Sequence, residues 1–90
     1  MKPSEYITKG WCQGAVARDI EGQPTGAERP TACTWCLMGA VIAAYPYDPC
    51  KRTNIWDCLD KQSIMLPAEW NDDPKRKQSE VVSLLQSIGE

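Results

Sequence analysis

The chain has 90 residues, 42% of them hydrophobic, which suits a single domain with one small core. Its 10 basic and 12 acidic residues give a net charge of −2, and this balance argues against direct nucleic-acid binding, because domains that bind nucleic acids are usually basic. Histidine is absent, so the Cys–His pair of a cysteine nucleophile is excluded.

A short helix is predicted at the start of the chain, over residues 3–9. Ser4 is a candidate for its N-cap, and Gly10 is expected to end it. This segment has no apolar stretch of the kind found in a signal peptide. We therefore expect a cytoplasmic protein, whose five cysteines are free thiols, ligands or core residues rather than disulfides.

Residues 11–25 are the only candidate for β structure. We expect a two-stranded hairpin with arms near residues 12–18 and 23–25, joined by a turn with Gly22 at its last position. Gly14 weakens the first arm, and it can mark a bulge or a close backbone approach. An irregular loop is the alternative structure for this segment.

Residues 30–45 are the most apolar stretch and predict the central helix. It is expected to begin at Pro30 or Thr31 and to end at Tyr45, because Pro46 follows. A helix that is apolar nearly all round should be buried on several sides. The stretch is shorter than the roughly 18 residues that a membrane span needs, so we expect no membrane insertion. Small residues at four-residue spacing, including Gly39, make a shallow groove where another element, usually a helix, can approach closely.

The second half of the chain predicts two more helices. One begins at residues 48–49 or 53–54 and runs to about Lys61. A short turn near residues 67–70 and dense turn chemistry at 71–74 follow. In the last helix, which ends at a glycine, hydrophobic residues recur at i, i+3, i+4 and i+7, namely Val81, Leu84, Leu85 and Ile88. The predicted fold is mainly α (α+β), a single domain over residues 1–90 in which a helical bundle surrounds a buried central helix beside a short β-hairpin.

Several motifs together resemble a family of small proteins of unknown function from bacteria and their phages. The resemblance covers residues 10–88, and its motifs are GWCQGA with ARD, WCL with GA, and WND, which begin at Gly10, Trp35 and Trp70. It implies a fold-level template and a phage or prophage setting, but no activity. The first helix looks shorter than is usual in the family. Lys77 stands where a capping Thr is common, which implies an N-cap weaker by up to about 1 kcal/mol.

The cysteines offer two metal or redox alternatives. Cys33 and Cys36 form a CxxC in the first turns of the predicted helix, where a thiol pKa is lowered, but the βαβ context of a redox pair is missing. A zinc site would need both of them with Cys12 and one further cysteine, and no second CxxC exists. We favour two buried thiols on one helix face and expect neither a metal nor a cofactor.

The candidate site residues are Trp11, Cys12, Arg18, Asp19, Trp35, Trp70, Asn71 and Asp72. In the structural interpretation, a buried Arg18–Asp19 or Arg18–Asp72 pair fastens the hairpin to the last turn, and Asn71 and Asp72 make caps or Asx-turns. In the functional interpretation, the three indoles and these polar groups line one pocket.

The favoured function is a non-enzymatic accessory protein, encoded by a phage or prophage, that binds and inhibits a host protein such as a defence complex. An acidic surface would speed its encounter with a basic partner. The alternative is a small-molecule-binding domain or minor enzyme that uses a Trp/Arg/Asp pocket. No phosphate-binding glycine motif is present to support a nucleotide enzyme.

Overall fold

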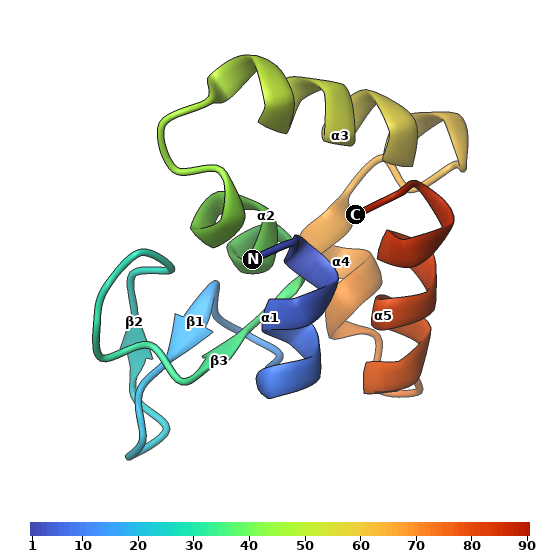
Figure 1. Ribbon diagram of the computed structural model, residues 1–90. Coiled ribbons are helices and arrows are strands. Elements are labelled where there is room, and N and C mark those ends of the chain that lie inside the picture. Colours follow the sequence, from blue (N-terminus) through green and yellow to red (C-terminus); the bar gives the residue numbers. More distant parts are fainter.

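The computed structural model describes residues 1–90, and its fold is mixed α+β and mainly helical, as the sequence predicts (Figure 1). It has five helices and one small antiparallel sheet, which lies at one side of the molecule beside α1 and α2. In chain order the elements are α1 Pro3–Lys9, β1 Ala17–Arg18, β2 Pro24–Thr25, β3 Thr34–Trp35, α2 Leu37–Ala44, α3 Pro49–Lys61, α4 Pro67–Asp72 and α5 Gln78–Ser87. None of the helices is long and hydrophobic enough to cross a membrane.

The sheet has three strands rather than the two of the predicted hairpin. Its order is β2-β1-β3, and Ala17 pairs with both Thr25 and Trp35. The first arm is confined to Ala17–Arg18, because Gly14 adopts a φ of 80° and the backbone before β1 turns away toward α4. The third strand comes from within the stretch that predicted the central helix.

The central helix therefore begins at Leu37, and the predicted start at residues 30–31 is wrong. The backbone ahead of it is held by the sheet: the N–H of Trp35 donates to Gly10 (3.0 Å), and the N–H of Cys36 donates to Val16 (3.0 Å). These contacts with distant residues override the local apolar pattern. Cys36 is the N-cap, and its Sγ accepts a hydrogen bond from the N–H of Gly39.

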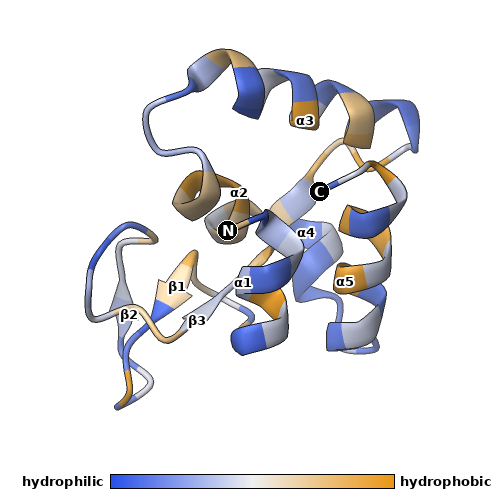
Figure 2. Ribbon diagram, viewed as in Figure 1, coloured by the Kyte–Doolittle hydropathy of each residue, from blue (hydrophilic) through white to orange (hydrophobic).

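Burial of α2 on several sides is confirmed. Leu37, Ala40 and Val41 have no exposed surface, and Figure 2 shows hydrophobic colouring along most of α2. The small residues do accommodate a close neighbour, but that neighbour is backbone before β1 rather than a helix. A Cβ on Gly39 would lie 1.8 Å from the carbonyl oxygen of Val16.

The other helices close the core around α2. α1 packs against α2 and α5, while α3 crosses one end of the molecule (Figure 1). Of the two predicted starts, α3 uses the first, with the Asp48 side chain accepting from the N–H of Lys51 (3.0 Å). Residues 67–72 form a helix where only a turn at 67–70 was expected. The apolar stripe of α5 is confirmed, with Val81 and Leu85 fully buried.

The two ends of the described chain meet. Both the N–H and the hydroxyl of Ser4 donate to the carbonyl oxygen of Glu90. The Glu90 carboxylate in turn accepts from the Tyr45 hydroxyl and pairs with the Lys51 ammonium at 2.8 Å. A single nearly buried residue thus ties α1, α2 and α3 together.

Candidate functional site

Asn71, at the end of α4, is the centre of the polar cluster that the sequence marks. It has no exposed surface. Its Oδ1 accepts from Trp11 Nε1 (2.7 Å) and from the N–H of Leu37 (3.0 Å), while its Nδ2 donates to Cys12 O and Asp72 Oδ1 (both 3.0 Å). These contacts use both lone pairs and both N–H groups of the amide. The side chain therefore has no polar atom left for a ligand.

The segment before β1 is fastened to the same helix end. The Gln13 side chain donates to the carbonyl oxygens of Asn71 and Asp73 (2.9 Å each). The N–H of Gly14 donates to Asp72 Oδ1 (3.0 Å). Asn71 and Asp72 thus hold backbone groups of a distant segment, which is the kind of structural role that we expected, although the contacts are not Asx-turns.

Arg18 has no carboxylate partner, so the predicted Arg18–Asp19 or Arg18–Asp72 ion pair is wrong. Its guanidinium instead donates to the carbonyl oxygens of Gln13 (3.0 and 3.3 Å) and Gly22 (2.9 Å). The planar fork of donors thus reaches two main-chain carbonyls instead of a carboxylate. The Asp19 side chain stabilises the turn between β1 and β2 by accepting hydrogen bonds from the N–H groups of Glu21 and Gln23.

The three tryptophans named with this cluster are not brought together around one cavity. The indole of Trp11 is bonded to Asn71, and that of Trp35 donates to Ala27 O (3.1 Å). Trp70 lies under the guanidinium of Arg76, 3.7 Å from the ring centroid. Of the eight residues predicted for the site, Trp35 is the only one that lines the cavity described below.

The cysteines do not form a pair on a helix face. All five are free, and Cys33 is exposed whereas Cys36 is buried, because strand β3 separates them. This corrects the expectation of two buried thiols on one helix. Burial raises the pKa of the Cys36 thiol above its ordinary value, which disfavours the nucleophilic thiolate. No three Cys, Asp or Glu side chains lie together in a way that could hold a metal ion.

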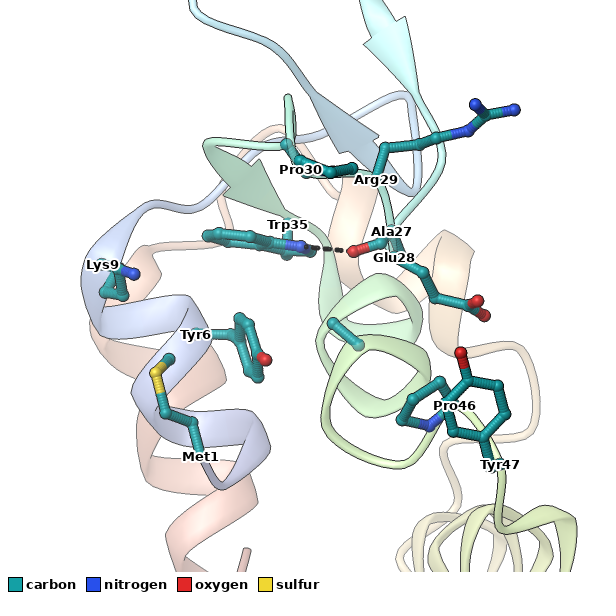
Figure 3. Close-up of a pocket in the computed structure, with 12 residues that line it drawn as sticks. Met1, Tyr6, Lys9, Ala27, Glu28, Arg29, Pro30, Trp35, Pro46 and Tyr47 are labelled. Carbon is teal, nitrogen blue, oxygen red and sulfur yellow. Dashed lines mark hydrogen bonds between the residues drawn. The ribbon is translucent and has the colours of Figure 1, made fainter.

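A cavity of about 340 Å³ lies beside α1 and α2, under the connection from β2 to β3 (Figure 3). Tyr6 and Trp35 form one wall, with ring centroids 4.9 Å apart in an edge-to-face arrangement. Glu28 and Tyr47 lie on the opposite side (Figure 3), and Ala43 of α2 also lines the cavity. Aromatic rings and polar groups therefore surround one hollow.

The charged side chains at this cavity have no ion-pair partners in the protein. The ion pairs of the chain are Lys51–Glu90 and Arg76–Glu80, so the charges of Lys9, Glu28 and Arg29 are not paired. Tyr47 is 92% exposed. Sequence reasoning missed Tyr6, Glu28 and Tyr47 as a set, because they come from α1, a connection and a linker, and no spacing relates them.

The comparisons with known proteins concern the whole chain. No curated protein and no solved structure shows significant similarity to it. A family of unknown function, DUF6197, matches residues 4–89, which is nearly the full length. This match confirms the expectation that the chain belongs to a family of unknown function. The chain is therefore a member of the DUF6197 family.

Proposed function

We propose that the protein is a non-enzymatic interaction module that acts by binding another protein. The observation that carries the proposal is that some polar side chains of the protein are bonded within the fold, whereas others have no ion-pair partner. Arg18 and Asn71, which the sequence marks, are bound to other groups of the fold, whereas the charged side chains of Lys9, Glu28 and Arg29 at the cavity have no ion-pair partner. Neither an amide nor a protonated guanidinium can act as a general base, so these two residues give no support to catalysis.

Exposed apolar side chains also support a role in contacts. Ile20 is 89% exposed, Tyr47 92%, Met65 74% and Leu66 60%. Tyrosine and methionine are enriched at protein interfaces relative to other surfaces. Tyr47 belongs to the cavity, so an apolar contact and a set of free polar groups coincide there.

The charge of the chain supports a basic partner. A net charge of −2 favours encounter with a positively charged surface. In its narrower form, the proposal is that the chain is phage- or prophage-encoded and inhibits a host protein, for example a nucleic-acid-binding defence complex in the host cytoplasm. The support for this form is the small size, the acidic balance and the motif resemblance.

A small-molecule-binding domain is the second candidate, and the cavity favours it. Its volume of about 340 Å³ falls at the lower end of the range for ligand pockets, roughly 300–1,000 Å³. The ligand would contact Tyr6, Trp35 and Tyr47, and not the Trp11–Arg18–Trp70–Asp72 set that the sequence indicates.

Capture from a lysate of the natural host separates these functions. A tagged protein is purified and its mass is measured under native conditions. The interaction module is expected to retain one protein in stoichiometric amount. A protein that carries only a small molecule would contradict the lead and support the second candidate.

A further inference from the structure

We propose that Cys12 and Cys36 are a redox-responsive pair, which a small peroxide joins in a reversible disulfide. The two cysteines belong to the motifs that begin at Gly10 and Trp35, and the proposed interaction function gives them no role. The pair differs from the CxxC of the sequence, because Cys33 is exposed and lies on the other side of strand β3 from Cys36. The inference is independent of the proposed function, since it concerns the interior of the fold.

The backbones of the two cysteines run side by side. Trp11 and Trp35 form a parallel β-bridge, in which the N–H of Trp35 donates to Gly10 O at 3.0 Å. The N–H of Cys12 donates to Trp35 O at 3.2 Å. Cys12 and Cys36 are the next residues along the two bridged segments. Neighbouring strands lie about 4.8 Å apart, and residues at the same level of a parallel pair face the same side. This spacing is within the roughly 4.4–6.8 Å between Cα atoms that a disulfide needs.

The Asn71 side chain holds the two segments together on the other side of the cysteines. Its Nδ2 donates to Cys12 O, and its Oδ1 accepts from the N–H of Leu37, the residue after Cys36 (3.0 Å each). One amide therefore spans the two backbones. Hydrogen bonds before and after the pair fix its Cα atoms, so a disulfide can close by rotation of the side chains without backbone movement.

The two sulfur atoms lie against the same stretch of backbone, the segment before β1. Cys12 Sγ donates to Ala15 O at 3.6 Å. Cys36 lines a second cavity, of about 200 Å³, together with Ala15 and Val16. Both cysteines are nearly buried, with 9% and 4% of their surface exposed. Burial is the main cause that raises the pKa of the Cys36 thiol, and Cys12 is among the further causes, as expected of neighbouring thiols.

The second cavity is large enough to admit hydrogen peroxide, because a water molecule takes only about 30 Å³. The Cys36 thiolate attacks one peroxide oxygen: an S–O bond forms, the O–O bond breaks, and the leaving hydroxide becomes water with the proton of the thiol. The Cys12 thiolate then attacks this sulfenic sulfur, so that an S–S bond forms, the S–O bond breaks and a second water leaves with the Cys12 proton. Two thiols are oxidised to one disulfide, and one peroxide is reduced to two waters.

The test uses the full chain with Cys33→Ser, Cys50→Ser and Cys58→Ser, because these three cysteines are exposed and would react by themselves. Only Cys12 and Cys36 remain. After treatment with hydrogen peroxide, the protein is expected to lose both thiols in a DTNB assay and two hydrogen atoms in its intact mass, and dithiothreitol should restore both. The oxidised form should melt several degrees above the reduced form, because the cross-link restricts the unfolded chain.

The matched control keeps Cys33 and Cys36 and carries Cys12→Ser, with the other two exposed cysteines replaced as before. Cys12→Ser retains a donor for Ala15 O, and circular dichroism reports that the control folds. Peroxide should add oxygen to the control or link its molecules in pairs, which also shows that enough oxidant is present. The inference is overturned if the test protein keeps its thiols under these conditions, gains oxygen instead of losing hydrogen, or melts at a lower temperature when oxidised. An internal disulfide that forms as readily in the control would overturn it too.

Discussion

Asn71 has no exposed surface, so its amide can be satisfied only by other groups of the protein. It bridges the indole of Trp11, the first N–H of α2 and the backbone of Cys12. Removing it leaves several buried donors and acceptors without partners, at a cost of about 1–3 kcal/mol for each.

Asn71→Ala is therefore expected to lower the free energy of unfolding by roughly 3–5 kcal/mol, as measured by urea denaturation. Asn54→Ala is the matched control, because Asn54 is exposed on α3 and should change stability by less than about 0.5 kcal/mol. A loss of under 1 kcal/mol at Asn71 would show that water or a neighbour replaces its contacts.

Glu90 is a second residue on whose contacts the stability of the fold depends. Burial by itself would raise the pKa of its carboxyl, but hydrogen bonds from Lys51 and Tyr45 outweigh burial, and the net pKa lies below the ordinary value. A lowered pKa in the fold means that the ionised form stabilises the native state. This contribution is fully present above the unfolded-state pKa of about 4.3, and it is lost as the pH falls through the folded-state pKa.

Glu90→Gln should accordingly be less stable than the wild type at pH 7, with a difference that narrows as the pH falls below about 4. Melting temperatures measured from pH 7 to pH 3 follow this difference. Glu69→Gln, at an exposed carboxylate, should follow the wild type throughout. A difference in melting temperature between the wild type and Glu90→Gln that stays constant with pH would contradict the link between the Glu90 pKa and stability.

Among the elements, α2 shows what the sequence could and could not predict. Its apolar residues, its end before Pro46 and the stripe of α5 follow from local pattern and proline chemistry, so they were predictable. The start of α2 was not predictable, because the β-branched Thr34 and the apolar Trp35 fit a strand as well as they fit a buried helix. Hydrogen bonds from Trp35 to Gly10 and from Cys36 to Val16 keep this segment extended, and the two acceptors lie about 20 positions or more away in the chain.

Gly39 allows α2 to approach the backbone of Val16, just before β1, closely. Gly39→Ala should cost more than about 3 kcal/mol, because the added Cβ would overlap backbone that cannot swing aside as a side chain does. The same substitution at Gly26 meets only the flexible side chain of Arg29, so Gly26→Ala should change the unfolding free energy by under about 1 kcal/mol. Equal denaturation midpoints for the two variants would contradict this packing.

The N-terminus of α5 has half a capping box. The Glu80 carboxylate accepts from the N–H of Lys77 (2.8 Å), but a lysine side chain has no acceptor to return the bond. Lys77→Ser should complete the box, adding about 0.5–2 kcal/mol and raising the melting temperature by several degrees. Lys75→Ser, in the turn before α5, should have no such effect. A melting temperature that does not rise in Lys77→Ser would show that the end of α5 is already satisfied.

For the molecule as a whole, the candidate site could be predicted only in part. The sequence identified Trp35, and it identified the polar cluster around Asn71, whose contacts in the structure are all within the fold. It could not group Tyr6, Glu28 and Tyr47, because they come from α1, the connection between β2 and β3, and the linker between α2 and α3, which meet at one cavity only in the folded chain. Exposure, which marks Tyr47, is likewise a property of the folded chain.

The proposed function lies in contacts at the surface around the cavity rather than in the Trp–Arg–Asp set. The most direct test is partner capture from a lysate of the natural host by the tagged wild type, Tyr47→Ala and Met65→Ala. Met65 is also exposed but lies outside the cavity, so it is the matched control. We expect one stoichiometric protein partner with the wild type and Met65→Ala, and its loss with Tyr47→Ala. No partner in any sample, or full retention by Tyr47→Ala, would contradict it.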